Sequence, residues 1–144
     1  ARVFQPMIEV ITTQNITACQ ALRRAVFIHE QGVPVEDEVD GKDPEATHLL
    51  ANLNGWPVGA ARVLPLGDTA KIGRICVLRD HRGKGIGRAI IEACHETARG
   101  LGARRAILGA KVPALPFYER LNYRAYGEEF EDAGLPHRMM EISL

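Results

Sequence analysis

Cysteine is scarce in this sequence of 144 residues, which holds only Cys19, Cys76 and Cys94. Three thiols so far apart exclude a disulfide framework and a paired CxxC zinc site. We therefore expect reduced thiols, no bound metal and a cytoplasmic location. Long apolar runs are also missing, since none approaches the roughly 20 residues of a membrane-spanning helix. Residues 1–6 lack the basic and then apolar segments of a secretory leader.

An excess of charge of one sign is absent as well. Lys and Arg total 18, as do Asp and Glu, so the formal net charge is zero and no global field favours a nucleic acid or an anionic membrane as partner. Aromatic residues make up only 6% of the chain, which argues against a stacking platform for single-stranded nucleic acid. Because no repeat or linker interrupts the sequence, its length predicts one domain over residues 1–144.

What is present is an alternation of strand and helix patterns. Strands are predicted at residues 7–11, 48–53, 56–64, 71–78, 106–110, 123–128 and 137–144. Helices are predicted from an Asn15 cap to about Glu30, from Ile86 to Gly100 or Gly102, and over residues 113–121. Residues 31–45 have no helical period and hold two prolines and two glycines, which predicts an ordered loop. The fold class is α/β, with a mixed, partly parallel central sheet flanked by helices.

The most informative segment is ICVLRDHRGKGIGR, residues 75–88. Its apolar start, Ile75 to Leu78, predicts a central strand buried on both faces. A glycine-rich turn then opens a helix, where free backbone N–H groups and the helix dipole favour an anion. The glycine spacing fits neither GxGxxG nor GxxxxGK[ST], which disfavours a dinucleotide fold and a nucleoside triphosphate loop. The alternative is a tight turn with no ligand.

Two motifs make the sequence resemble the GNAT N-acetyltransferases. Residues 82–87, RGKGIG, match the R/Q-x-x-G-x-G/A motif of that family, and residues 115–123, LPFYERLNY, are similar to its FYEKLGF signature. Asn122 stands for the usual Gly and Tyr123 for the usual Phe. Further segments, among them Glu30-Gln31 and residues 134–137, resemble a branch of small bacterial members whose acceptors are mostly unassigned.

The resemblance implies a sheet whose central strands are splayed around acetyl-CoA. The pantetheine arm would contact the backbone of Ile75, Cys76 and Val77. The pyrophosphate would lie on the turn and helix start, formed by Arg82, Gly83, Lys84, Gly85, Ile86, Gly87 and Arg88. Lys111 replaces a usual Asn or Gln. Because many members are dimers, a homodimer is a further expectation.

Tyr118 has two interpretations. Its spacing of three from both Leu115 and Leu121 is typical of a core residue. The resemblance instead implies the general acid that protonates the CoA thiolate, with a strand amide near Val77 stabilising the oxyanion. Cys76 lies inside an apolar strand, so we interpret it as a packing residue rather than a nucleophile.

The acceptor is expected near the acidic loop. Seven acidic residues lie between Glu30 and Glu45 against one Lys, which favours a cationic amine unless the charges serve solubility alone. Candidate acceptor-pocket or base residues are Glu38, Asp40, Asp43 and His48, whereas His29 and His137 are interpreted as satisfied or exposed. The leading hypothesis is direct acetyl transfer from acetyl-CoA to a primary amine of a small molecule or protein. The alternatives are a non-catalytic acyl-CoA-binding regulatory module and, with least support, nucleic-acid binding.

Overall fold

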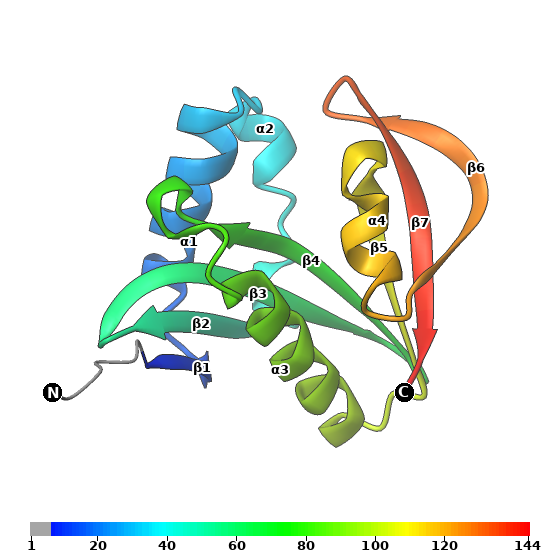
Figure 1. Cartoon of the computed structure of the whole chain (residues 1–144), viewed down its shortest axis with the longest axis horizontal. Helices are drawn as coiled ribbons and strands as arrows, with labels where there is room; N and C mark the ends of the chain where they lie inside the picture. The colour runs from blue at the N-terminus through cyan, green and yellow to red at the C-terminus, as the bar shows by residue number, and fades with distance from the viewer. Residues whose placement is uncertain (1–6) are drawn as a thin grey trace, which may run out of the picture.

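The structure is a computed structural model that describes residues 7–144 (Figure 1). The expectation about a leader in residues 1–6 lies outside this range. One mixed sheet has the strand order β1-β2-β3-β4-β5-β7-β6. The strands are β1 (Ile8–Thr13), β2 (Thr47–Leu53), β3 (Trp56–Leu66), β4 (Thr69–Val77), β5 (Arg105–Lys111), β6 (Arg124–Asp132) and β7 (Leu135–Ser143). The predicted α/β class and the single parallel crossover, from β4 to β5, are confirmed.

The helices fall near the predicted ranges. They are α1 (Ile16–Arg23), the π-helix η1 (Arg24–Glu30), α2 (Val35–Glu38), α3 (Ile86–Gly100) and α4 (Leu115–Glu119), with 3-10 turns at Asp43–Glu45, Arg79–His81 and Val112–Ala114. Asn15 caps α1 as predicted, because its side chain accepts a hydrogen bond from the Ala18 amide at 3.1 Å. The change to π winding after Arg23 was not predicted, because the apolar spacing is compatible with both windings.

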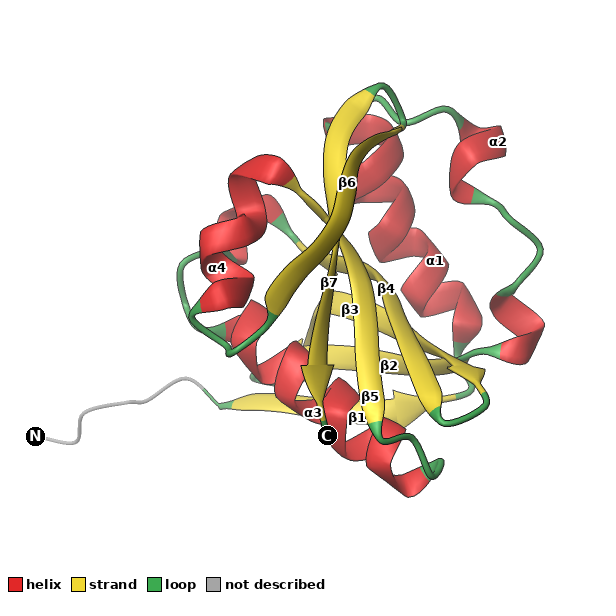
Figure 2. Cartoon of the chain, turned by 90° about the vertical axis from the view of Figure 1, so that its right-hand side faces the viewer, coloured by secondary structure: helices red, strands yellow, loops and turns green. Residues whose placement is uncertain are grey.

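Helices cover both faces of the sheet, and the alternation along β2 separates two cores. Leu49 and Ala51 pack in the larger core, to which α3 contributes Ile90 and Cys94. Leu50 points to the other face and packs with residues of α1. Figure 2 shows α1 and α3 on opposite sides of the sheet. The Ile86-to-Gly100 helix therefore fixes the glycine turn that precedes it against the end of β4.

The prediction of a loop over residues 31–45 needs correction. Two short turns interrupt it, α2 and the 3-10 turn at Asp43–Glu45. Neither is long enough to produce a hydrophobic period, so sequence periodicity could not reveal them. They are held by side-chain contacts to the rest of the molecule, described below.

The two central strands separate along their length. β4 and β5 pair over only three residue pairs, from Thr69 with Arg105 to Lys71 with Ile107. Beyond this point β5 continues beside β7 while β4 continues beside β3, and Figure 1 shows the two strands diverging from a shared end near the C-terminus. The prediction that Ile75 to Leu78 is buried on both faces is therefore wrong: Cys76 is buried, but its three neighbours are only half-buried.

Candidate functional site

The divergence of β4 and β5 opens onto a cavity of about 290 Å³. Its wall includes Ile75 of β4, Gly109 of β5 and Tyr118 of α4. Residues of η1, α2 and β7 complete the wall. Half of the wall thus comes from β5 and the segments that follow it, and half from the elements before α3. A molecule lying between the strands would contact both halves.

The glycine turn at the end of β4 has the geometry that an anion site needs. Gly83 and Gly85 have φ of 76° and 82°, a left-handed conformation that side-chain-bearing residues rarely adopt. Gly85 precedes the first residue of α3, so the amides of the first helical turn have no intrahelical acceptor. A Cβ placed on Gly87 would lie 3.6 Å from the Phe117 ring, which brings α4 next to this helix start.

Arg82 makes contacts that its motif did not predict. Its Nη1 and Nη2 atoms donate to the Glu30 carboxylate at 2.6 and 2.7 Å, and Nε donates to the Val77 carbonyl at 3.0 Å. The hydrogen bonds from Arg82 lower the pKa of Glu30, and Glu30 in turn raises that of Arg82. The guanidinium therefore links the end of η1 to the end of β4, and its charge is already paired.

The two other candidate cations of the turn differ from Arg82. Arg88 pairs with Glu92 at 3.0 Å on the exposed side of α3, and Lys84 is exposed. Because exposed ion pairs are weak, Arg88 can exchange Glu92 for another anion at small cost.

Cys76 lies behind the turn with 4% of its surface exposed, and burial raises the pKa of its thiol to about 12. This agrees with its interpretation as a packing residue.

Tyr118 both lines the cavity and packs against aromatic rings. Its ring makes edge-to-face contacts with Phe117 and Tyr123, with centroids 5.0 and 5.8 Å apart. Tyr123 is itself fixed by a 2.6 Å hydrogen bond between its hydroxyl and His95 Nε2. Burial raises the pKa of Tyr118 to about 12, so the phenol is protonated at neutral pH. The ring packs as its spacing predicted, and the role of Tyr118 as general acid stays a prediction.

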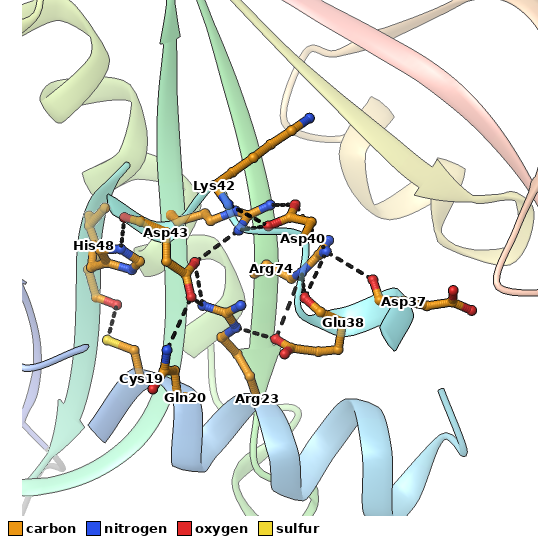
Figure 3. A network of polar contacts seen from close by, with 12 residues as sticks. Cys19, Gln20, Arg23, Asp37, Glu38, Asp40, Lys42, Asp43, His48 and Arg74 are labelled. Carbon is orange, nitrogen blue, oxygen red and sulfur yellow. Dashed lines mark hydrogen bonds and ion pairs between the residues drawn. The ribbon is translucent and has the colours of Figure 1, made fainter. Parts of the chain in front are cut away.

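The acidic candidates lie together but not as free carboxylates. Figure 3 shows most of a partly buried arginine–carboxylate network, which consists of Arg23, Arg62, Arg74, Glu38, Asp40 and Asp43. Arg23 donates to Glu38 at 2.5 Å and to Asp43 at 2.9 Å. Arg62 joins Asp43, at 2.9 Å, to Asp40. The network thereby ties the residues 31–45 segment to α1 and β3.

Pairing changes the acidity of two of these groups. Hydrogen bonds from Arg62 lower the pKa of Asp40 well below its usual range. Burial opposes ionisation of Asp43, but hydrogen bonds from Arg23 and Arg62 outweigh it and lower its pKa to about 2. Both carboxylates are therefore poor proton acceptors at neutral pH.

His48 belongs to the same region. It is buried, and its Nε2–H donates to the Asp43 backbone carbonyl at 2.9 Å. The structure brings Glu38, Asp40, Asp43 and His48 together, yet only Glu38 lines the cavity between β4 and β5. Three of the four candidates are thus not part of the cavity wall.

Several residues of the site were not predicted. Arg74 lines the cavity, and its side chain donates to the Asp37 and Glu38 carbonyls. Its backbone has a φ of 51°, a left-handed conformation that no sequence pattern predicted. Lys111 Nζ donates to Gln31 Oε1 at 2.7 Å. His137 was interpreted as satisfied or exposed, and it is satisfied, because Nδ1 donates to the Leu135 carbonyl at 2.8 Å. Its place in the cavity wall was not predicted. Arg23 had a signal, because it lies four residues after Cys19 and three before Val26, on the buried face of its helix.

Residues 7–144 contain neither a candidate metal cluster nor a candidate membrane-spanning helix. No group of three or more His, Cys, Asp or Glu side chains is placed to hold a metal ion within that range. None of the helices described is both long and apolar enough to cross a membrane.

Comparisons with known proteins match nearly the whole chain. A family model described as Acetyltransferase (GNAT) domain matches residues 11–144. YjcF of Bacillus subtilis, named as an uncharacterized N-acetyltransferase, is 42% identical over 83% of this chain and 86% of its own. The crystal structure of Escherichia coli ElaA superposes with a TM-score of 0.82 at 30% identity, over 94% of this chain and 99% of that one. An acyl-CoA N-acyltransferase from Pseudomonas aeruginosa gives 0.82 at 26% identity, over 95% and 99%.

Proposed function

Because the chain belongs to the GNAT acetyltransferase family, we propose that it transfers the acetyl group of acetyl-CoA directly to a primary amine. Family membership implies acyl transfer from acetyl-CoA to an amine. The observation that carries the proposal is the part of β4 that β5 leaves unpaired, which lines the same cavity as Tyr118 and leads along the chain to the glycine turn. In this proposal residues 1–144 form one acetyltransferase domain in the cytoplasm.

The donor fits the open edge of β4. Backbone groups of Ile75, Cys76 and Val77 would hold the pantetheine arm, because β5 no longer pairs with this part of the strand. The amides and positive charge of residues 82–88 would hold the pyrophosphate. In Arg82 the guanidinium already binds Glu30, so its contribution depends on exchange between that carboxylate and the phosphate.

The proposed chemistry needs few groups. The neutral amine attacks the thioester carbonyl, and a strand amide near Val77 stabilises the oxyanion. When the tetrahedral intermediate collapses, the carbon–sulfur bond breaks and the Tyr118 hydroxyl gives its proton to the CoA sulfur. A phenol that burial keeps protonated is suited to this step.

We still propose a cationic acceptor, but the carboxylates that would attract it are not the ones predicted from the sequence. Glu38, Asp40 and Asp43 are neutralised by arginines, but Asp37 of α2 and Asp132 of β6 also line the cavity. Neither makes an ion pair within the part of the chain that the structure describes. Figure 3 shows the Asp37 carboxylate directed away from the network. Two such carboxylates favour a protonated amine, whether on a small molecule or on a protein.

A thiol-release assay with acetyl-CoA tests the proposal. We expect steady CoA release that depends on one class among a polyamine, an amino sugar, an amino acid and a lysine peptide, with mass spectrometry detecting the acetylated amine. Calorimetry measures acetyl-CoA binding separately. Binding without turnover for every amine would support the regulatory module instead, and no binding at millimolar acetyl-CoA would contradict both functions.

A further inference from the structure

Direct transfer to an amine requires a group that removes a proton from the amine nitrogen. The four base candidates from the sequence are poorly placed for this step. Glu38 is held by Arg23, Asp40 and Asp43 are held by Arg62, and His48 lies outside the cavity wall. The cavity must therefore supply this group from elsewhere, or the amine must lose its proton to solvent.

His137, at the start of β7, is the histidine that lines this cavity. It is only 8% exposed, and its ring lies 5.8 Å from the ring of Phe130 on β6. Its Nδ1 lies 2.8 Å from the Leu135 carbonyl oxygen. Because a carbonyl can only accept, Nδ1 carries the hydrogen and the lone pair is on Nε2.

The tautomer matters because only Nε2 can accept a proton. A backbone carbonyl that binds Nδ1–H fixes both the orientation of the ring and its basic atom, as the orienting group of a histidine base does in other enzymes. Imidazole is also the side chain that most often transfers protons in enzymes. His137 therefore combines position, orientation and chemistry.

We propose that His137 is the general base of the acetyl transfer, accepting the amine proton at Nε2 directly or through one water. This inference rests on the proposed function. It assigns a role to a histidine that was not among the base candidates predicted from the sequence. Tyr118 and His137 line the same cavity, from α4 and from β7. The amine would bind between these two side chains.

The protons balance over one cycle. An acceptor that binds as the ammonium first releases one proton to solvent. The neutral nitrogen then bonds to the carbonyl carbon, and the proton on this nitrogen in the intermediate passes to Nε2 of His137. The carbon–sulfur bond breaks, and the sulfur takes the proton of Tyr118. The imidazolium proton returns to the tyrosinate through water, so that the products are the amide and the CoA thiol and both side chains regain their starting states.

Charged and titratable groups from each neighbouring element act on His137. Lys111 of β5 is its partner across the β5–β7 ladder, and Tyr118 of α4 shares its cavity wall. The remaining groups of the wall are Arg74 of β4, Asp37 and Glu38 of α2, and Asp132 at the end of β6.

The test compares His137→Gln with the wild type. The acceptor is whichever of spermidine, glucosamine and Nα-acetyl-lysine the wild type acetylates fastest. We expect kcat to fall about 100-fold, the KM for acetyl-CoA to stay within about twofold because the donor is proposed to be held along β4 and the glycine turn, and the acidic limb of the kcat/KM pH profile to disappear. His29→Gln, which changes an exposed histidine outside the cavity, should leave all three unchanged.

A second variant separates chemistry from folding. His137→Ala should bind acetyl-CoA like the wild type and regain turnover when imidazole is added. A His137→Gln enzyme that keeps its turnover and its acidic limb would overturn the inference, as would a folded His137→Ala enzyme that imidazole does not rescue. A wild type that acetylates no amine would instead contradict the proposed function, so the two failures are distinguishable.

Discussion

Tyr118 lies where the aromatic cluster of α4 meets the cavity. The residue lines the cavity, and its ring is held by Phe117 and Tyr123. Its exchange for Phe keeps the ring contacts and removes only the proton that the reaction is proposed to use. The residue therefore offers a clean separation of packing from chemistry.

We expect Tyr118→Phe to lower kcat about 100-fold while the dissociation constant of acetyl-CoA changes little. Steady-state kinetics with the best acceptor, together with calorimetry, measure both quantities. The matched control is Tyr126→Phe on β6, because Tyr126 packs against Arg105 outside the cavity. Turnover that is equal in the Tyr118→Phe enzyme and the wild type would remove the assigned role.

A second residue-scale prediction concerns Glu30. Glu30→Gln removes the carboxylate that pairs with Arg82, so the guanidinium gains a free charge beside the glycine turn. We expect acetyl-CoA to bind about threefold more tightly at low salt, with the gain shrinking as salt screens the added charge. Calorimetry at two ionic strengths measures this. Glu9→Gln, an equal charge change on the edge strand β1, is the control, and weaker binding in Glu30→Gln alone would refute the prediction.

At this scale the sequence could predict residue types better than pairings. The motif identified Arg82 and Tyr118, but the partner of Arg82 is 52 residues away and no local pattern points to it. The acidic loop was recognised as a cluster of charge. That Arg62 and Arg74 would neutralise it depends on β3 and β4 passing beneath the loop, which only the tertiary structure reveals.

Among the elements, the segment between η1 and β2 depends most on side-chain contacts. α2 is a single turn, and the buried Arg23 of α1 links it to the 3-10 turn at Asp43–Glu45. The segment forms one wall of the cavity through Asp37 and Glu38. The network is thus the means by which α1 positions the acceptor side of the site.

We expect Arg23→Met to lower the free energy of unfolding by about 3 kcal/mol, because it leaves the buried Glu38 carboxylate without its closest partner. Urea denaturation measures the loss. Arg99→Gln breaks an exposed pair with Glu96 on α3 and should cost less than about 0.5 kcal/mol. Equal, small losses in the two variants would show that the network contributes little to stability.

Element prediction succeeded where the signal was local. The Asn15 cap, the glycine turn and the helix from Ile86 were predictable from a few neighbouring residues. Strand burial was not, because an apolar run such as Ile75 to Leu78 looks the same whether its second face meets a strand or a ligand cleft. Which of the two occurs is set by where β5 leaves β4.

At the scale of the whole molecule, the arginine–carboxylate network makes the free energy of unfolding depend on pH. Asp43 has a folded pKa of about 2, and that of Asp40 is also lowered, whereas an unfolded aspartate titrates near about 3.9. A lowered folded pKa means that unfolding takes up protons, so the contribution is complete above about pH 4 and is lost as the pH falls towards about 2. Stability should therefore decline in this window.

Urea denaturation between pH 7 and pH 2 measures this decline. An Asp40→Asn, Asp43→Asn double variant should be less stable at pH 7 and should lose part of its acid dependence, since its amides cannot take up the protons. A wild type and a double variant with parallel profiles below pH 4 would contradict the assignment. Asp68→Asn, in the β3–β4 turn, tests for a general effect of removing an aspartate.

The short parallel ladder between β4 and β5 has a consequence for hydrogen exchange. Past Lys71 and Ile107, the facing edges of both strands carry amides with no neighbouring strand as acceptor, so deuterium should replace their hydrogens quickly. A pantetheine chain supplies amide carbonyls of its own and would slow that replacement. The pattern of protected positions would then trace the bound arm of the donor along the sheet, residue by residue.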